Sequence, residues 1–261
     1  MKKKIADLLR KLEKEHNITI LFAVENGSRA WGMDSQDSDY DVRFVFYRPL
    51  KDYITLNKPD EVITVAFDEN LEPHDVQGSL VDMSGFDIFK YLKLLASSNP
   101  TTIEWLNSPI VYLGDNNIEL KPYMAANFSQ EKLFYHYFSL FANNYKLYIR
   151  EGKEITYKKY LYSMRGLLNA EYVLKYDKIL PLLMRETVKA MQDNMPPEVV
   201  SKLDEVIEIK SKGLEKKTVL RMPVFDEYFA KAMNKNYDNI GKRRVDYTVF
   251  NAFLRKCLGG K

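Results

Sequence analysis

The stretch of sequence that decides the fold lies between residues 27 and 43. It begins with Gly-Ser-Arg-Ala-Trp-Gly (27–32) and ends with Ser-Asp-Tyr-Asp-Val-Arg (38–43). The second part starts a run of alternating polar and apolar residues that predicts a strand. Side chains two apart on a strand point to the same face, so Asp39, Asp41 and Arg43 would share one face of that strand.

Two adjacent carboxylates at the start of a buried strand repel each other, and the arrangement is costly unless a cation bridges them. Mg²⁺ (or Mn²⁺) is the natural cation, because it prefers hard oxygen ligands and shares them with substrate phosphates. Two such ions about 3.5–4 Å apart can clamp the oxygens of an in-line phosphoryl displacement. We therefore predict that Asp39 and Asp41 are metal ligands and catalytic residues. Taken alone, an Asp-x-Asp pair on a strand is more often a solvated edge.

Gly27 and Ser28 form the second half of the predicted site. Glycine permits close backbone approach, a following helical turn offers backbone N–H groups to a phosphate, and Ser28 adds a hydroxyl donor. A Gly-Ser turn by itself is usually only a turn. A Gly-Ser turn after one buried strand, followed by Asp-x-Asp at the start of the next strand, is much more specific.

Around this motif, periodicity and breakers predict an α+β fold with a small mixed sheet flanked by helices, followed by an all-helical part. We expect a nucleotide-handling domain at residues 1–125 and a helical domain at residues 126–261. Strands are predicted at 18–24, 39–47, 61–67, 79–84 and 110–113, and helices at 3–15, 88–99, 101–106, 129–150, 156–175, 181–192, 197–213, 223–236 and 245–257. Ser84 and Asp87 have the spacing of a capping box before the helix at 88–99.

The Gly-Ser and Asp-x-Asp combination resembles the signature of the polymerase-beta nucleotidyltransferase superfamily. With the phrases at 98–100, 104–112 and 158–165, the chain is similar over much of residues 18–175 to a bacterial and phage family of nucleotidyltransferases, some of which are associated with RNA ligases. The resemblance implies transfer of a nucleoside monophosphate from an NTP such as ATP to an acceptor hydroxyl, with release of pyrophosphate. The association with RNA ligases implies RNA repair, with an RNA end as the acceptor.

The superfamily also has a third acidic residue on a neighbouring strand, which completes a metal site and helps to deprotonate the attacking hydroxyl. Asp82 is our candidate, because alternation sends it to the face opposite Val81 and Met83. Asp87 can instead cap the following helix, and Asp75 falls in a predicted loop.

Five further side chains are candidates for nucleotide binding. Arg29 and Arg43 could contact triphosphate oxygens, because a guanidinium matches phosphate geometry. Arg43 could equally neutralise the aspartates on its own face, and Arg29 could be a surface residue. Lys158, Tyr162 and Arg165 lie on one stripe of the predicted helix at 156–175, which either grips the nucleotide or is a solvated face.

Composition sets broader limits. Residues 34–87 hold thirteen acidic and four basic residues, whereas residues 145–178 hold eight basic and four acidic ones, as a metal-binding half and a phosphate-binding half would. The same asymmetry would arise from solvated surfaces. The single cysteine, Cys257, cannot form an internal disulfide, and the longest apolar run is too short to span a bilayer. We expect a cytoplasmic protein without a membrane partner.

Other functions remain open at this point. The acceptor could be an RNA end, a protein side chain or a small molecule. The chain could also be a nucleotide-binding regulator or an antitoxin-like protein without turnover, although Asp39 and Asp41 are both present. The sequence leaves the choice of NTP and the oligomeric state undetermined.

Overall fold

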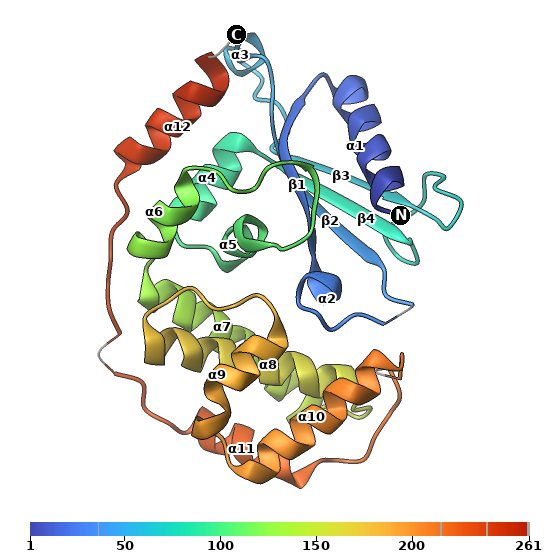
Figure 1. Cartoon of the computed structure of the whole chain (residues 1–261), viewed down its shortest axis with the longest axis vertical. Coiled ribbons are helices and arrows are strands. Elements are labelled where there is room, and N and C mark those ends of the chain that lie inside the picture. The colour runs from blue at the N-terminus through green and yellow to red at the C-terminus, as the bar shows by residue number, and fades with distance from the viewer. Residues whose placement is uncertain (36, 215, 239, 260–261) are drawn as a thin grey trace. The chain divides into compact units, whose positions relative to one another are not determined.

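A five-stranded mixed sheet organises the first half of the chain in the computed structural model, which describes residues 1–35, 37–214, 216–238 and 240–259 (Figure 1). The strand order is β3-β4-β2-β1-β5. β2 is antiparallel to β1 and parallel to β4, while β3 and β5 add antiparallel edges. The strands are β1 (Thr19–Asn26), β2 (Tyr40–Tyr47), β3 (Val62–Phe67), β4 (Val81–Asp87) and β5 (Val111–Gly114). The predicted α+β class is confirmed.

One face of this sheet is covered by the first helix, α1 (Lys2–His16). The alternate residues Val42, Phe44 and Phe46 of β2 are fully buried in one cluster with Leu9 and other apolar residues of α1. The alternation that buries these residues leaves Asp41 and Arg43 on the opposite face, as the sequence predicts. Apolar packing on one side of β2 therefore fixes where its charged residues point.

Further helices belong to the same compact unit as the sheet. They are α2 (Gly27–Ala30), α3 (Leu50–Tyr53), α4 (Ile88–Ala96), α5 (Pro100–Asn107), α6 (Leu120–Asn127) and α12 (Tyr247–Gly259). The sequence prediction did not include α6. It did place α12, as the helix at 245–257.

The start of α4 differs from the predicted capping box. Asp87 is itself the N-cap, and its carboxylate accepts a hydrogen bond from the Phe89 N–H at 2.9 Å. Ser84 lies within β4, with its hydroxyl 3.4 Å from that of Thr64 on β3. β4 continues to the last residue before the helix, so the serine is used by the sheet and only the aspartate is available to cap.

The predicted helix at 88–99 is also shorter than expected. It ends at Ala96, and Ser98 has a left-handed backbone with φ of 59°. Asn99 then caps α5 by accepting a hydrogen bond from the Thr101 N–H at 3.0 Å, and Pro100 is the first residue of α5. Proline favours the first helical position because it lacks the N–H that would be unsatisfied there.

The named elements described in the second half of the chain are helical, in the order expected from the breakers. They are α7 (Gln130–Asn144), a π-helical turn η1 (Tyr145–Arg150), α8 (Tyr157–Tyr176), α9 (Met184–Met191), a 3₁₀ turn η2 (Gln192–Asn194), α10 (Pro197–Ser211) and α11 (Pro223–Met233). α7 and α8 form the core, and Gly166 lets them approach closely. A Cβ on Gly166 would lie 2.9 Å from the Phe141 backbone nitrogen, so a larger residue would push the helices apart.

The chain folds as two compact units. The sheet unit comprises Met1–Ala30, Asp39–Phe128 and Arg244–Lys261, and the helical unit comprises Trp31–Ser38 and Ser129–Arg243. After Phe128 the chain leaves the sheet unit and enters the helical unit, close to the predicted boundary between residues 125 and 126. The C-terminal segment, however, returns to the sheet unit, because Phe250 of α12 is buried and contacts Tyr123.

Among the described residues, no helix is both long and apolar enough to cross a membrane.

Candidate active site

The glycine turn and the second aspartate of the motif are in direct contact. Gly27 follows β1 with a left-handed backbone, φ 64°, which side-chain-bearing residues rarely adopt. A Cβ placed on it would lie 2.0 Å from Asp41 Oδ2. Only glycine fits at this position, so the structure brings the two halves of the sequence motif together.

Asp41 and Asp82 lie side by side on neighbouring strands. β2 and β4 are parallel and in a register that pairs Asp41 with Asp82. The Nη2 atom of Arg43 lies 2.8 Å from Asp82 Oδ2 and 3.3 Å from Asp41 Oδ1, while its Nη1 donates to the backbone carbonyls of Val42 and Asp82. Arg43 therefore pairs with both aspartates.

This pair of carboxylates fits a hard cation in one specific respect. Asp82 Oδ1 is buried and has no hydrogen-bond partner among the described residues, which is costly for a carboxylate oxygen and leaves it available as a ligand. Across the described residues, no three acidic, histidine or cysteine side chains are grouped closely enough to hold a metal ion by themselves. Mg²⁺ commonly uses one or two carboxylates together with waters and substrate phosphates, so such a closed group is not required.

Asp39 is placed differently from Asp41, with which it was predicted to bind a metal ion. It lies one residue before β2, and its side chain is exposed. Its backbone carbonyl accepts a hydrogen bond from Arg29 Nε at 3.1 Å, and the Arg29 guanidinium carbon lies 3.9 Å from the centre of the Tyr40 ring. Arg29 therefore ties α2 to the start of β2. Ser28 is half-buried in α2 between Gly27 and Arg29.

A buried carboxylate behind Asp41 was not predicted from the sequence. Glu25 is 1% exposed, and its Oε1 accepts the Asp41 N–H at 2.8 Å while Oε2 accepts the hydroxyl of Tyr112. Burial raises the pKa of Glu25 to about 7, although the hydrogen bonds from Tyr112 and Asp41 act in the opposite direction. A signal was present in the sequence, because Glu25 is a charged residue at the end of an apolar run.

The three predicted contacts from the second half of the chain lie on α8 in the helical unit. Arg165 is 5% exposed, and its guanidinium carbon lies 3.6 Å from the centre of the Trp31 ring. Tyr162 meets Trp31 edge to face at 5.7 Å, and the Lys158 ammonium lies 5.5 Å from the Tyr162 ring centre. Arg165 and Tyr162 therefore both contact the Trp31 ring, and Lys158 contacts Tyr162. Arg165 is buried, so it does not belong to a solvated helix face.

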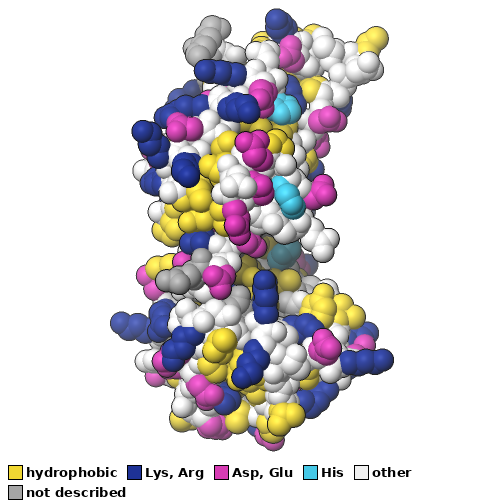
Figure 2. Space-filling model, turned by 90° about the vertical axis from the view of Figure 1, so that its right-hand side faces the viewer, with side chains coloured by type: hydrophobic (Ala, Val, Ile, Leu, Met, Phe, Trp, Pro, Cys, Tyr) yellow, Lys and Arg dark blue, Asp and Glu magenta, His cyan; other side chains and the backbone are white. Residues whose placement is uncertain are grey.

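Charge on the surface is mixed. Figure 2 shows Lys and Arg side chains interspersed with Asp and Glu on the face that it draws. Both signs of charge therefore occur on this face, without a patch of a single sign that covers it.

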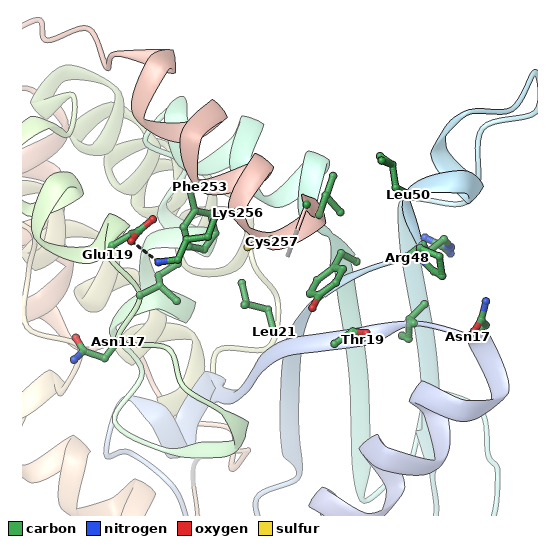
Figure 3. A pocket seen from close by; sticks show the side chains of 16 residues that line it. Asn17, Thr19, Leu21, Arg48, Leu50, Asn117, Glu119, Phe253, Lys256 and Cys257 are labelled. Carbon is green, nitrogen blue, oxygen red and sulfur yellow. Dashed lines mark hydrogen bonds and ion pairs between the residues drawn. The ribbon is translucent and has the colours of Figure 1, made fainter. Parts of the chain in front are cut away.

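A cavity of about 920 Å³ lies in the sheet unit at the end of β1 away from Gly27 (Figure 3). The first residues of β1 and the last residues of α12 contribute to its walls, and a 2.8 Å ion pair joins Lys256 to Glu119 there. Its lining contains none of the predicted site residues.

A mixed sheet that sets a glycine turn against paired aspartates is the arrangement of a polymerase-beta-type nucleotidyltransferase. Residues 1–256 match the RNA repair pathway DNA polymerase beta family, and the chain belongs to this family. It is a nucleotidyltransferase of that class.

Two individual proteins were also compared with the chain. It is 35% identical over 265 residues to uncharacterized protein YcgL of Bacillus subtilis (strain 168), a match that covers 99% of this chain and 95% of the relative. The crystal structure of a nucleotidyltransferase-like protein from Exiguobacterium sibiricum 255-15 matches 87% of this chain and 78% of its own, at 12% identity and a TM-score of 0.29. That structural similarity is too low to carry an argument about the site.

Proposed function

We propose that this protein transfers a nucleoside monophosphate from an NTP to an acceptor hydroxyl and releases pyrophosphate. The observation that carries the proposal is the placement of Asp41 beside Asp82, next to Gly27, with one buried oxygen of Asp82 unpartnered. Such a pair of carboxylates needs positive charge nearby. A Mg²⁺ or Mn²⁺ ion that binds together with a nucleoside triphosphate would supply it.

Nucleotidyl transfer depends on positioning and charge neutralisation more than on covalent catalysis. The acceptor oxygen bonds to the α-phosphorus of the NTP, and the bond from that phosphorus to pyrophosphate breaks. Asp41 and Asp82 would hold the metal ion, with Asp39 as the third predicted ligand. The ion would neutralise charge on the reacting phosphate. Asp82 would also help to deprotonate the acceptor hydroxyl, which is the role that the resemblance to the superfamily implies for its third acidic residue.

Binding of the triphosphate is assigned to Gly27, Ser28 and Arg29 at the end of β1. Arg43 contributes positive charge from within the carboxylate pair. Lys158, Tyr162 and Arg165 of the helical unit stay predicted nucleotide contacts. Arg165 also stacks on Trp31, so it has a packing role as well.

An RNA end is the acceptor that we favour. The support is the description of the family, which places its members in an RNA repair pathway. A protein side chain and a small metabolite are the competing acceptors.

One observation favours the alternative of a nucleotide-binding regulator without turnover. Arg43 contacts both Asp41 and Asp82, so one of the two negative charges is already balanced without a metal ion. A protein of this kind would bind NTP equally well with and without Mg²⁺.

The decisive experiment follows label from each of the four α-labelled NTPs, with Mg²⁺ or Mn²⁺, into an RNA pool, a protein extract and a metabolite extract. Transfer that the parent performs and that Asp41→Asn and Asp82→Asn lose would support the proposal. Asp75→Asn is the matched control, because Asp75 is an exposed carboxylate and should retain transfer. No transfer, together with metal-independent NTP binding that Asp41→Asn leaves unchanged, would establish the regulator instead.

A further inference from the structure

Glu25 is placed where it can control the position of Asp41. It is the last residue but one of β1, and all of its polar groups are engaged. Its N–H donates to the Ile110 carbonyl at 2.9 Å, and its own carbonyl accepts the Ser108 hydroxyl at 2.6 Å. Its carboxylate accepts from the backbone N–H of Asp41 and from the hydroxyl of Tyr112.

A buried carboxylate at this position is expensive. Burial of a charge costs several kcal/mol unless partners compensate, and an apolar residue would pack there without that cost. The neighbouring carboxylate of Asp41 adds repulsion, which contributes to the raised pKa of Glu25. Stability alone therefore does not explain why the strand carries glutamate at this point.

We propose that Glu25 is a positioning residue, which holds the backbone of Asp41 so that the Asp41 carboxylate packs against Gly27 beside Asp82. The inference rests on the proposed function, because it assigns Asp41 the role of metal ligand. Tyr112 and Ser108 anchor Glu25 in turn. Groups behind metal ligands typically change metal affinity or activity by about 10–100-fold when they are removed.

The chain contains a matched control at the other end of β4. Asp87 is also buried, and it also accepts one backbone N–H, from Phe89, and one tyrosine hydroxyl, that of Tyr53 at 2.7 Å. It lies five residues beyond Asp82 along the same strand. Loss of either carboxylate removes the same kind of buried network, but only Glu25 contacts the backbone of Asp41.

The test compares the parent with Glu25→Ala, Glu25→Gln and Asp87→Ala. Binding of Mn²⁺ is titrated by electron paramagnetic resonance on folded protein, transfer is measured at a series of Mn²⁺ concentrations, and exchange of the Asp41 amide is followed by NMR. We expect Glu25→Ala to raise the Mn²⁺ requirement about 10-fold or more and to speed exchange of that amide. Glu25→Gln should stay within about 3-fold of the parent, because its amide oxygen still accepts the Asp41 N–H. Asp87→Ala should lower thermal stability without changing either quantity.

The outcomes distinguish failure of the positioning role of Glu25 from failure of the proposed function. If the parent binds Mn²⁺ and transfers nucleotide but Glu25→Ala has the same Mn²⁺ requirement as Asp87→Ala, the role of Glu25 is overturned while the proposed function stands. If the parent shows neither Mn²⁺ binding nor transfer, the proposed function fails. In that case, exchange of the Asp41 amide still tests whether Glu25 holds the backbone of Asp41. Equal exchange rates in Glu25→Ala and the parent would overturn the positioning role of Glu25 too.

Discussion

Arg43 is the residue on which the character of the carboxylate pair depends. Its side chain is 17% exposed, and one nitrogen atom contacts both Asp41 and Asp82. A cation so placed keeps two neighbouring carboxylates compatible in a protein without bound nucleotide. It also competes with a metal ion for the oxygens that it contacts.

We expect Arg43→Ala to destabilise the metal-free protein by about 1–2 kcal/mol, because two partly buried carboxylates lose their counter-charge. Added Mg²⁺ should then restore more stability in the variant than in the parent, since it replaces the lost charge. Urea unfolding with and without Mg²⁺ measures both effects. An equal response of parent and variant to Mg²⁺ would mean that no ion binds between these aspartates.

The limits of sequence reasoning are clear for individual residues. The motif assigned Gly27 and Asp41 to one site but did not predict that they touch, and the choice of Asp82 followed from alternation along a strand. The pairing of Asp41 with Asp82 could not be read from local sequence, because register between strands far apart in the chain is set by packing of the whole sheet. Glu25 was missed because an apolar run predicts only burial, not which polar group the buried residue meets.

At the scale of elements, the junction of β4 with α4 shows how one side chain serves two purposes. Asp87 caps α4 and also pairs with Arg48 at 3.3 Å. Burial raises the pKa of Asp87, and its hydrogen bonds from Tyr53 and Phe89 offset this only in part. The folded state therefore binds the Asp87 proton more tightly than the unfolded state does.

This shift has a definite sign for stability. Between the unfolded pKa, near 3.8, and the higher folded pKa, the folded protein binds more protons, so the contribution of Asp87 to stability falls as pH rises. Asp87→Asn keeps one acceptor oxygen, which can still cap the Phe89 N–H, and it cannot titrate. We expect the free energy of unfolding of the parent, relative to this variant, to decrease as pH rises above about 4. Urea titrations across that range measure the difference, and a difference that rises with pH would contradict the assignment.

Helix α8 offers a test of nucleotide contact against packing. Arg165→Ala should destabilise the helical unit by about 2 kcal/mol, because a buried guanidinium leaves the Trp31 ring. Arg165→Lys should lose much of the same stability, since an ammonium cannot stack as a plane. Lys158→Ala, in which a half-buried side chain is shortened, should weaken NTP binding with little loss of stability. Thermal unfolding and equilibrium NTP binding separate the three variants. Unchanged stability in Arg165→Ala would argue against the packing role.

Most helices and strands were predictable because their apolar periods of 3.6 and 2 are local properties. Helix α6 was missed, and its short apolar pattern does not separate it from a linker. The place of α12 could not be predicted for a different reason. Periodicity shows that Phe250 and Phe253 share an apolar face, but it does not say which unit buries them.

At the scale of the whole molecule, the sheet unit depends on a helix from the far end of the chain. Phe250→Ala should destabilise it by about 3 kcal/mol through a cavity beside Tyr123. Amide exchange should increase in α4 and α6, which lie in that unit, and stay unchanged in α8. Tyr247→Ala is the matched control in the same helix, and its 56% exposed side chain should cost less than about 0.5 kcal/mol. Faster exchange confined to α8 would contradict the division into units.

The order of the units along the chain also bears on how the protein is made. A ribosome delivers the five strands of the sheet before the helical unit, yet α12 emerges after residue 243, where the helical unit ends. Domains tend to fold as units during synthesis. The sheet unit must therefore wait, with the surface that receives α12 uncovered, while the helical unit is completed. That unit includes residues 31–38, which lie between the Gly-Ser turn and the Asp-x-Asp pair. In a newly made chain, Asp41 and Asp82 are therefore synthesised well before the helix that completes the unit carrying them.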